Sequence, residues 1–293
     1  MRTRINVIIF GVDRCPELCR PGLENFLSGL CECADIYIGL ISLAQNDSRN
    51  NEQQGLENWV NDIMGRHQLW NVRICQIFTQ ADPGSYGNQR LLDKSLDLCM
   101  SRLDIFYNNY ESIHNYMNYL YFSYCFSKKI ARSVENRPTL LLRPDMLYGG
   151  LYSKHFDNFI HFIEANHRAA FVLSHDSFGF VNDRFFASSL QYVISYMQRI
   201  EGLGRYLFWP WRYFHSEKYA LWFTLWRLNL QVNELPLSFW GKRVRANEQI
   251  LNDSDPSSYA IERRAYAKMF ALHSYWQLML SLKKCTTWLE HMQ

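Results

Sequence analysis

The chain has 293 residues, of which 48% are hydrophobic and 20% charged, a balance that favours one large α/β domain or two small ones around a sizeable core. A net charge of +3 lacks the clustered basic character of nucleic-acid-binding proteins, so no nucleic-acid partner is expected. No stretch approaches the roughly 20 uncharged apolar residues that cross a bilayer, and eight cysteines without CxxC pairs or a secretory signal favour a cytoplasmic protein with reduced thiols.

The first part of the chain alternates predicted strands and helices. Apolar runs predict strands at 5–10, 34–43 and 72–78, and helical spacing of apolar residues predicts helices at 17–30 and 56–67. An order of strand, helix, strand, helix and strand is typical of a parallel sheet. We therefore expect an α/β fold with a mostly parallel, Rossmann-type central sheet flanked by helices.

The first strand ends at Gly11, and Arg14 follows three residues later. A GxGxxG sequence is absent here, so the dinucleotide-binding fingerprint is absent too. A glycine after the strand lets the backbone approach a ligand closely, and Arg14 has the reach and the charge to bind a phosphate. The alternative is a tight turn with a surface arginine.

The middle of the chain places a charged pair after a buried strand. Residues 89–136 predict long helices that lead into a strand at 139–142. That strand runs into Arg143-Pro144-Asp145, and the proline cannot continue a sheet ladder. A cation and a carboxylate at the carboxyl end of a buried strand lie where open α/β sheets bind ligands, and a surface ion pair is the alternative. Gly149-Gly150 then predicts a loop.

A second polar segment lies between a predicted strand at 169–174 and a predicted helix at 187–199. It contains Asn182, Asp183 and Arg184 in a row. Three hydrogen-bonding side chains just before a helix suit a polar, hydroxyl-rich ligand. Their alternative role is to cap the helix and to form a local ion pair.

An aromatic segment, 206–214, precedes the titratable residues His215 and Glu217. Titratable groups beside a wall of rings are in a setting where a pKa can be tuned. A helix is predicted at 218–230 and a strand at 231–240.

Three cations follow within residues 242–245, among them Arg243 and Arg245. They suit an anionic ligand such as a diphosphate, or they form a solvated edge. Residues 253–258 predict a linker, and the rest of the chain predicts one or two helices that pack on the outside.

Five of these polar segments stand in one order along residues 5–248. They are Gly11–Arg14, Arg143–Asp145, Asn182–Phe185, His215–Glu217 and Arg243–Arg245. In this order and spacing the series resembles a family of glycosyltransferase-like proteins of bacteria, algae and large algal viruses. The resemblance implies a GT-A-like α/β domain at 1–252, a helical C-terminal extension at 253–293, and a transferase that takes its sugar from a nucleotide sugar.

The resemblance also implies a donor site. In that family a short acidic motif at a strand end faces the donor diphosphate, and its counterpart here is Arg143-Pro-Asp145 rather than a plain Asp-x-Asp. The leaving diphosphate needs a metal or fixed cations. Asp145 is the candidate ligand for Mg²⁺ or Mn²⁺, and a metal-independent mechanism stays open. The candidate donor-binding residues are Gly11, Arg14, Arg143, Asp145, Arg184, Arg243 and Arg245.

An inverting transferase also needs a group that takes the proton of the acceptor hydroxyl. Asp183 is the first candidate for this base and Glu217 is the second. A glycan or lipid-linked acceptor could contact aromatic rings and nearby polar groups. These acceptor candidates are Asn182, Trp209, Trp211 and His215, together with the rings of Tyr213 and Phe214. Two alternatives remain: a non-catalytic glycan- or nucleotide-binding protein on the same fold, and a peripheral membrane contact through 206–214.

Overall fold

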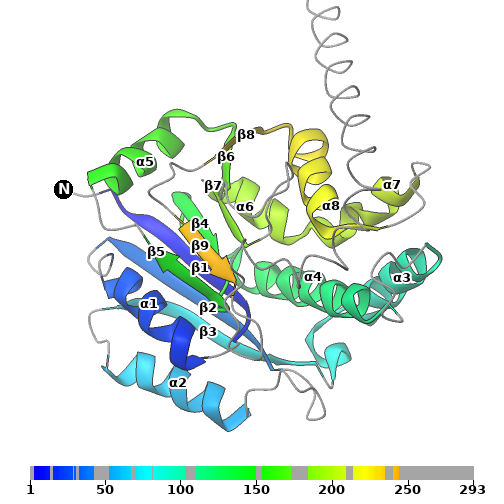
Figure 1. The fold of residues 1–293 in the computed structure, drawn as a ribbon, viewed down its shortest axis with the longest axis horizontal. Helices are drawn as coiled ribbons and strands as arrows, with labels where there is room; N and C mark the ends of the chain where they lie inside the picture. The colour runs from blue at the N-terminus through cyan, green and yellow to red at the C-terminus, as the bar shows by residue number, and fades with distance from the viewer. Residues whose placement is uncertain are drawn as a thin grey trace, which may run out of the picture.

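The computed structural model describes residues 3–13, 16–28, 30, 33–42, 53–66, 70–80, 82–102, 110–149, 154–172, 184–208, 214–234 and 240–243. Within them, seven strands form one sheet in the order β3-β2-β1-β4-β7-β6-β8, and β5 and β9 form a separate pair (Figure 1). The predicted fold class, α/β with a mostly parallel Rossmann-type sheet flanked by helices, is confirmed. The predicted C-terminal extension lies outside the described residues.

The strands are β1 (Ile5–Val12), β2 (Ala34–Ser42), β3 (Asn71–Thr79), β4 (Pro138–Leu142), β5 (Met146–Gly149), β6 (Ala169–Val172), β7 (Phe185–Ser189), β8 (Gln231–Glu234) and β9 (Trp240–Arg243). The helices are α1 (Pro16–Ser28), α2 (Gln53–Arg66), α3 (Gln89–Met100), α4 (Glu111–Ile130), α5 (Lys154–Ala165), α6 (Leu190–Met197), α7 (Leu203–Phe208) and α8 (Ser216–Trp222). Shorter turns of helix occur at η1 (Pro83–Tyr86), η2 (Arg199–Gly202) and η3 (Phe223–Arg227).

Strands that follow β1 in the sequence are added first on one side of β1 and then on the other. From β1 the chain goes to its neighbour β2 and then outward to β3, all parallel. It then returns to β4, which pairs with the other side of β1, again in parallel. β7 runs antiparallel to both β4 and β6, whereas β6 and β8 are parallel. The strand order therefore switches between β1 and β4, which is where open α/β sheets place a crevice for ligands.

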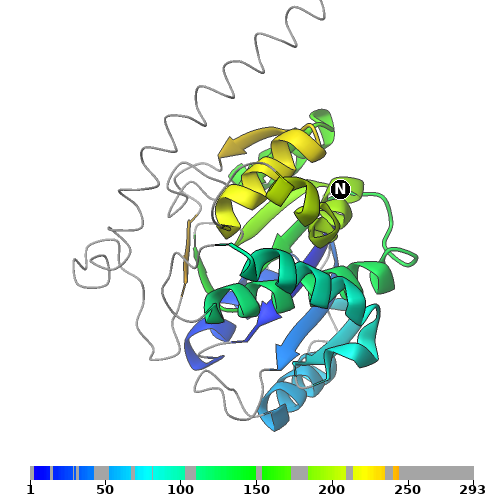
Figure 2. The same ribbon diagram turned by 90° about the vertical axis from the view of Figure 1, so that its right-hand side faces the viewer.

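Both faces of the sheet are covered, and this explains why β1 carries apolar side chains on both faces, with Asn6 as its one polar residue. Ile5, Val7 and Ile9 pack into one buried cluster with α1, α2 and α5. Ile8 and Phe10 point into a second cluster with α3, α4, α6 and α8. Figure 1 shows these two groups of helices on opposite sides of the sheet. In Figure 2, α3, α4 and α8 lie in front of the sheet. A strand that is buried on both faces has no need of polar alternation.

Three segments differ from the elements expected from the sequence. The helix predicted at 187–199 begins at Leu190, because Phe185–Ser189 instead pairs with β4 and β6 as β7. The loop predicted after residue 148 contains α5, and β5 precedes it. The strand predicted at 231–240 is two strands, β8 and β9, in different sheets. In each of the strand segments, pairing with distant strands overrides the local pattern.

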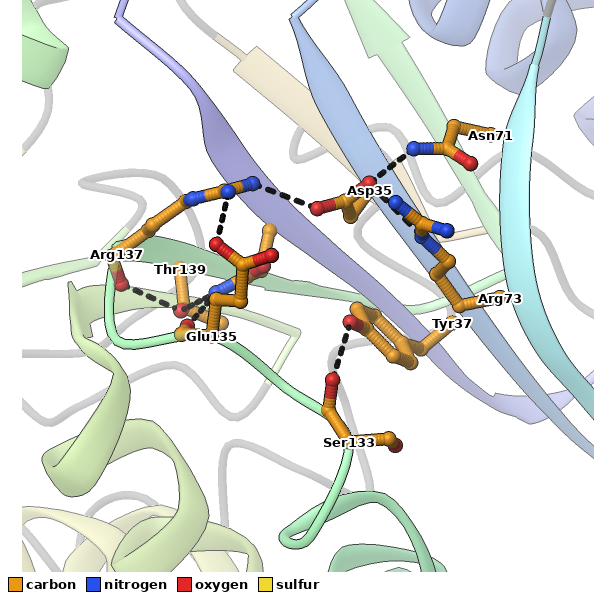
Figure 3. A network of polar contacts seen from close by, with 9 residues as sticks. Asp35, Tyr37, Asn71, Arg73, Ser133, Glu135, Arg137 and Thr139 are labelled. Atoms are coloured by element: carbon orange, nitrogen blue, oxygen red, sulfur yellow. Dashed lines mark hydrogen bonds and ion pairs between the residues drawn. The ribbon is translucent and has the colours of Figure 1, made fainter.

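A buried carboxylate joins the amino ends of the strands. Asp35, in β2, accepts hydrogen bonds from Arg137 at 2.6 Å, from Arg73 at 3.1 Å and from the amide of Asn71 (Figure 3). Arg137 also pairs with Glu135. These residues precede or open β2, β3 and β4, so the cluster lies at the edge of the sheet opposite the carboxyl ends. We call it the Asp35 cluster.

No helix among the described residues has both the length and the apolarity that a membrane crossing requires.

Candidate functional site

The Arg143-Pro-Asp145 segment forms a closed ion pair at the carboxyl end of β4. Nε of Arg143 donates to Oδ1 of Asp145 and Nη2 donates to Oδ2, each at 2.8 Å. This is the bidentate geometry in which guanidinium and carboxylate bind each other most strongly. A surface ion pair was the alternative interpretation of this segment from the sequence. The structure shows an ion pair that is buried instead. The Asp145 side chain is 0% exposed and that of Arg143 is 10% exposed, so the exposed surface of the pair belongs to Arg143.

Tyr148 in β5 fixes the backbone of this pair. Its hydroxyl accepts a hydrogen bond from the backbone N–H of Arg143 at 2.8 Å and lies 2.9 Å from the carbonyl oxygen of the same residue. The carbonyl oxygen of Arg184 is 3.4 Å away. Complete burial raises the pKa of Tyr148, so the phenol stays protonated and able to donate. The sequence offered no signal for this role, because the tyrosine reads as one more residue of an apolar stretch.

Gly11 lets β1 and the segment after β4 approach closely. Its φ is +144°, a region that residues with a side chain rarely adopt. A Cβ atom at this position would lie 3.3 Å from Cδ of Pro144 and 3.8 Å from the ring of Tyr119. The absence of a side chain on Gly11 therefore allows the end of β1 to lie directly beside the Arg143–Asp145 pair.

Asp13 and Arg20 form a second acid–arginine pair beside the first. Nε and Nη2 of Arg20, in α1, donate to Oδ2 of Asp13 at 2.9 and 2.5 Å. Burial raises the pKa of Asp13, Arg20 opposes this shift, and the negative charge of Asp145 adds to it. The two carboxylates are thus close enough to interact. Sequence reasoning missed this pair, although Asp13 stands directly after the first strand and Arg20 lies about two helical turns further on.

Tyr119 of α4 lies close to two guanidinium groups. The Arg143 guanidinium carbon is 5.3 Å from its ring centre, and that of Arg199 is 5.7 Å away. Arg199 is fully buried, stacks on the Tyr196 ring at 4.1 Å and donates to the Tyr196 carbonyl oxygen at 3.0 Å. Cation–π contacts of this kind hold a ring and a guanidinium in a fixed mutual orientation. Tyr119 therefore has little freedom to move away from Arg143.

The strand register brings two further predicted donor-binding positions to the same edge. Leu142 pairs with Phe185, so the backbone of Arg184 lies across from that of Arg143. Arg243 in β9 pairs with Met146, the residue after Asp145. The side chain of Arg243 lies outside the described residues, as do Arg14 and Arg245.

The described residues include both His215 and Glu217 from the predicted acceptor-side and catalytic candidates. His215 precedes α8, and its Nδ1 accepts from the backbone N–H of Lys218 at 3.4 Å. Glu217 lies in the first turn of α8 and is 9% exposed. Asn182, Asp183, Trp209, Trp211 and Tyr213 lie outside the described residues. Their predicted roles stay predictions.

Phe214 is a core residue and not part of an exposed aromatic platform. It is 2% exposed and packs against the rings of Tyr116, Tyr206 and Tyr219. Tyr116 in turn stacks on Tyr119 at 6.0 Å between ring centres. A row of rings therefore runs from the start of α8 to the Arg143–Asp145 pair, which connects the His215–Glu217 segment to the candidate site.

The oxygen donors around Asp145, as far as the structure describes them, do not fit a divalent cation. Mg²⁺ and Mn²⁺ favour several oxygen ligands in near-octahedral geometry. Both oxygens of Asp145 already accept hydrogen bonds from Arg143, and its side chain has no exposed surface. Within the described part of the chain, no group of three or more His, Cys, Asp or Glu side chains is arranged to hold a metal ion.

No protein-family model and no curated protein matches the sequence. Among solved structures, the chain is similar to one from Bacillus anthracis described as a putative glucose-1-phosphate thymidylyltransferase in complex with sucrose, with a TM-score of 0.39, 11% identity and coverage of 82% of this chain and 89% of that one. It is similar to HddC from Yersinia pseudotuberculosis (TM-score 0.36, 10% identity, 83% and 93% covered). It is also similar to the glycosyltransferase GlyE of Streptococcus pneumoniae TIGR4 (TM-score 0.37, 12% identity, 80% and 45% covered). At these identities and TM-scores none of the three assigns a role to a residue of this chain.

Proposed function

We propose that this chain is a glycosyltransferase that moves a sugar from a nucleoside diphosphate to a hydroxyl group of a glycan or a lipid-linked acceptor. One observation carries the proposal. At the switch in strand order, the carboxyl ends of β1 and β4 bring together Gly11, Asp13, Arg143 and Asp145. A close-approach glycine beside an oriented guanidinium is suited to a phosphate-containing ligand.

We assign to Arg143 the role of stabilising the leaving diphosphate. In the transfer, the acceptor oxygen bonds to the anomeric carbon of the sugar, the bond from that carbon to the diphosphate oxygen breaks, and negative charge develops on the diphosphate. A fixed cation at that position stabilises the transition state without having to reorganise. Arg184 lies beside it through the β4–β7 pairing. Arg14, Arg243 and Arg245 are further proposed contacts of the diphosphate.

Asp183 is the proposed base that takes the proton of the acceptor hydroxyl in an inverting transfer, with Glu217 as the second choice. Asn182, Trp209, Trp211 and His215 are the proposed acceptor contacts. The test is the Asp183→Asn variant, in which we expect loss of transfer and unchanged donor binding. Full transfer activity in this variant would remove Asp183 from the role.

A thermal-shift screen against nucleotide sugars tests the function itself. A ligand that binds the folded state stabilises it by mass action, by about 2.7 kcal/mol at a concentration of about 100 times its Kd. We expect at least one nucleotide sugar to raise the melting temperature of the wild type and to have a much smaller effect on Arg143→Met. Arg137→Met serves as the matched control, because Arg137 pairs with a buried acid at the opposite edge of the sheet.

The competing proposal is a non-catalytic protein that binds a nucleotide sugar or a glycan on the same fold. It predicts the same thermal shift but no transfer to any acceptor and no hydrolysis of the donor. Mass spectrometry of the donor after prolonged incubation with a mixture of glycan acceptors separates the two. Persistent binding with an intact donor would favour the non-catalytic protein.

A peripheral membrane contact through 206–214 is a separate proposal. Among the described residues of this segment, burial leaves few side chains able to contact a membrane. Tyr206, Leu207 and Phe214 are each at most 2% exposed and belong to the core, whereas Phe208 at the end of α7 is 90% exposed. Flotation with vesicles of anionic lipid, comparing the wild type with Phe208→Ser, tests whether this ring contributes. Equal flotation of both proteins would exclude a contribution from Phe208.

A further inference from the structure

At the strand-order switch, the side chains of the two arginines keep some exposed surface and those of the two acids keep none. Side-chain exposure is 0% for Asp145 against 10% for Arg143, and 0% for Asp13 against 19% for Arg20. A carboxylate that binds a metal together with a donor diphosphate must be reachable by both. In this chain, the side chains that keep exposed surface are those of Arg143 and Arg20.

We propose that Asp145 is a positioning residue for Arg143 and not a metal ligand, so that this chain binds the diphosphate of its donor without a divalent cation. The inference rests on the proposed function, because it concerns how the same site holds a nucleoside diphosphate. It extends to Asp13, which holds Arg20 by the same kind of ion pair as Asp145 holds Arg143.

The first step is the bidentate geometry. Both oxygens of Asp145 accept from Arg143 at 2.8 Å, so a cation that coordinated this carboxylate would have to displace the guanidinium. The displaced guanidinium would lose its counter-charge in a buried setting, which is strongly unfavourable. Repulsion between the metal and the guanidinium acts in the same direction.

The second step is the fixed orientation of Arg143. Asp145 binds the guanidinium edge formed by Nε and one Nη2 hydrogen, the Tyr119 ring lies 5.3 Å from its carbon, and Tyr148 holds the backbone. A guanidinium has five N–H groups in one plane, so its remaining N–H bonds are directed away from Asp145. That planar edge matches a phosphate in bidentate fashion, and its orientation costs nothing at the moment of binding.

The third step concerns the second carboxylate. The charge of Asp145 contributes to the raised pKa of Asp13, so the counter-charges of the two acids have to be considered together. Oδ2 of Asp13 accepts two hydrogen bonds from Arg20. Each acid therefore already has an arginine as its counter-charge, and the pair of acids is neutralised within the protein.

Calorimetric titration with UDP, GDP, CDP and dTDP as probes, in EDTA and then in Mg²⁺ or Mn²⁺, tests the proposal on the full chain. We expect at least one diphosphate to bind in EDTA, with its Kd changing by less than about threefold on addition of metal, since the counter-charge comes from the protein. Mn²⁺ alone should leave the melting temperature unchanged. Binding that requires the metal overturns this inference and leaves the proposed function intact, whereas no binding in either buffer contradicts the proposed function.

Three variants test which residues determine the Kd for the diphosphate. Arg143→Lys keeps the charge but loses the planar fork, and we expect a Kd at least about tenfold higher. Asp145→Asn should raise the Kd similarly in EDTA and in metal, because it releases the guanidinium. Asp35→Asn is the matched control: Asp35 is also a buried acid paired with an arginine, at the opposite edge, and its loss should leave the Kd unchanged.

An Asp145→Asn protein that binds as tightly as the wild type would overturn the positioning role. Where this variant fails to fold, Arg143→Lys decides, because it leaves Asp145 in place. Unchanged affinity in Arg143→Lys would then overturn the proposal.

Discussion

The hydroxyl group of Tyr148 lies within hydrogen-bond distance of both the backbone nitrogen and the carbonyl oxygen of Arg143, at 2.8 and 2.9 Å. One side chain from β5 thereby holds the backbone at the point where β4 ends. A hydroxyl group can accept one hydrogen bond and donate another at the same time, which an apolar ring cannot do. The position of the Arg143 guanidinium thus depends on a residue five positions further along the chain.

Replacement of Tyr148 by phenylalanine should lower the free energy of unfolding by about 1–3 kcal/mol, because it leaves a buried backbone N–H without its acceptor. Urea denaturation measures this loss. Tyr37→Phe is the control, since Tyr37 is also buried, in β2, but its hydroxyl makes a longer bond of 3.5 Å to the Ser133 carbonyl oxygen. If the two variants lose the same stability, the hydrogen bonds of Tyr148 have no special weight.

Gly11→Ala should destabilise the protein by about 1–3 kcal/mol, because a side chain at φ +144° is strained and the new Cβ meets Pro144. Nucleotide binding should weaken as well, since Pro144 separates Arg143 from Asp145. Gly65→Ala is a matched change: Gly65 lies in α2, where an alanine methyl group would meet no neighbour within 4 Å, and alanine there should stabilise the helix by up to about 1 kcal/mol. If both variants change the free energy of unfolding by a similar amount and in the same direction, the proposed strain at Gly11 is contradicted.

The Asp35 cluster (Figure 3) predicts a graded series of stabilities. Asp35→Asn removes a buried charge that pairs with two arginines, and we expect a loss of about 3 kcal/mol. Arg137→Met should cost about 1–3 kcal/mol, because Arg137 is only 17% exposed. Arg73→Met should cost less than about 1 kcal/mol, because Arg73 is 47% exposed and its pair is screened by water. Urea denaturation of the three variants gives the order, and a larger loss for Arg73 than for Arg137 would contradict it.

Lys218 predicts a dependence of stability on pH. Burial lowers its pKa to about 8, so between this value and the ordinary lysine pKa the unfolded chain binds more protons than the folded one. Stability contributed by this residue therefore rises with pH above about 8, by at most about 1.4 kcal/mol per pH unit. Lys218→Met lacks the titrating group.

We expect the variant to gain stability relative to the wild type near neutral pH and to lose this advantage towards a pH of about 10. Urea denaturation of both proteins at several pH values measures the difference. A difference that stays constant from neutral pH upward would mean that the pKa of Lys218 is the same in both states.

The sequence was sufficient to predict β1, β2 and β4, because each is buried along almost all of its length and consists mostly of apolar residues in a local run. It was not sufficient for β7. The sequence pattern assigns residues 187–189 to the start of a helix, whereas the pairing of Phe185–Ser189 with β4 and β6 makes the segment a strand.

The candidate site divides in the same way. Gly11, Arg143 and Asp145 could be predicted by themselves, because a glycine and a charged pair directly after buried strands are local signals and parallel strands end at a common edge. The sequence could not predict which of the two charged side chains keeps exposed surface. The contacts of Arg143 with Tyr119 and Tyr148 could not be predicted either, because both tyrosines come from other elements and meet the site only through packing.

The sequence by itself therefore determined the α/β class and the common edge of the sheet at which Gly11 and Arg143 lie, since apolar periodicity and strand ends are properties of neighbouring residues. Only the tertiary structure decided that Asp145 lies inside and Arg143 nearer to solvent. Burial and charge pairing are set by segments far apart in the chain, and no local pattern contains them.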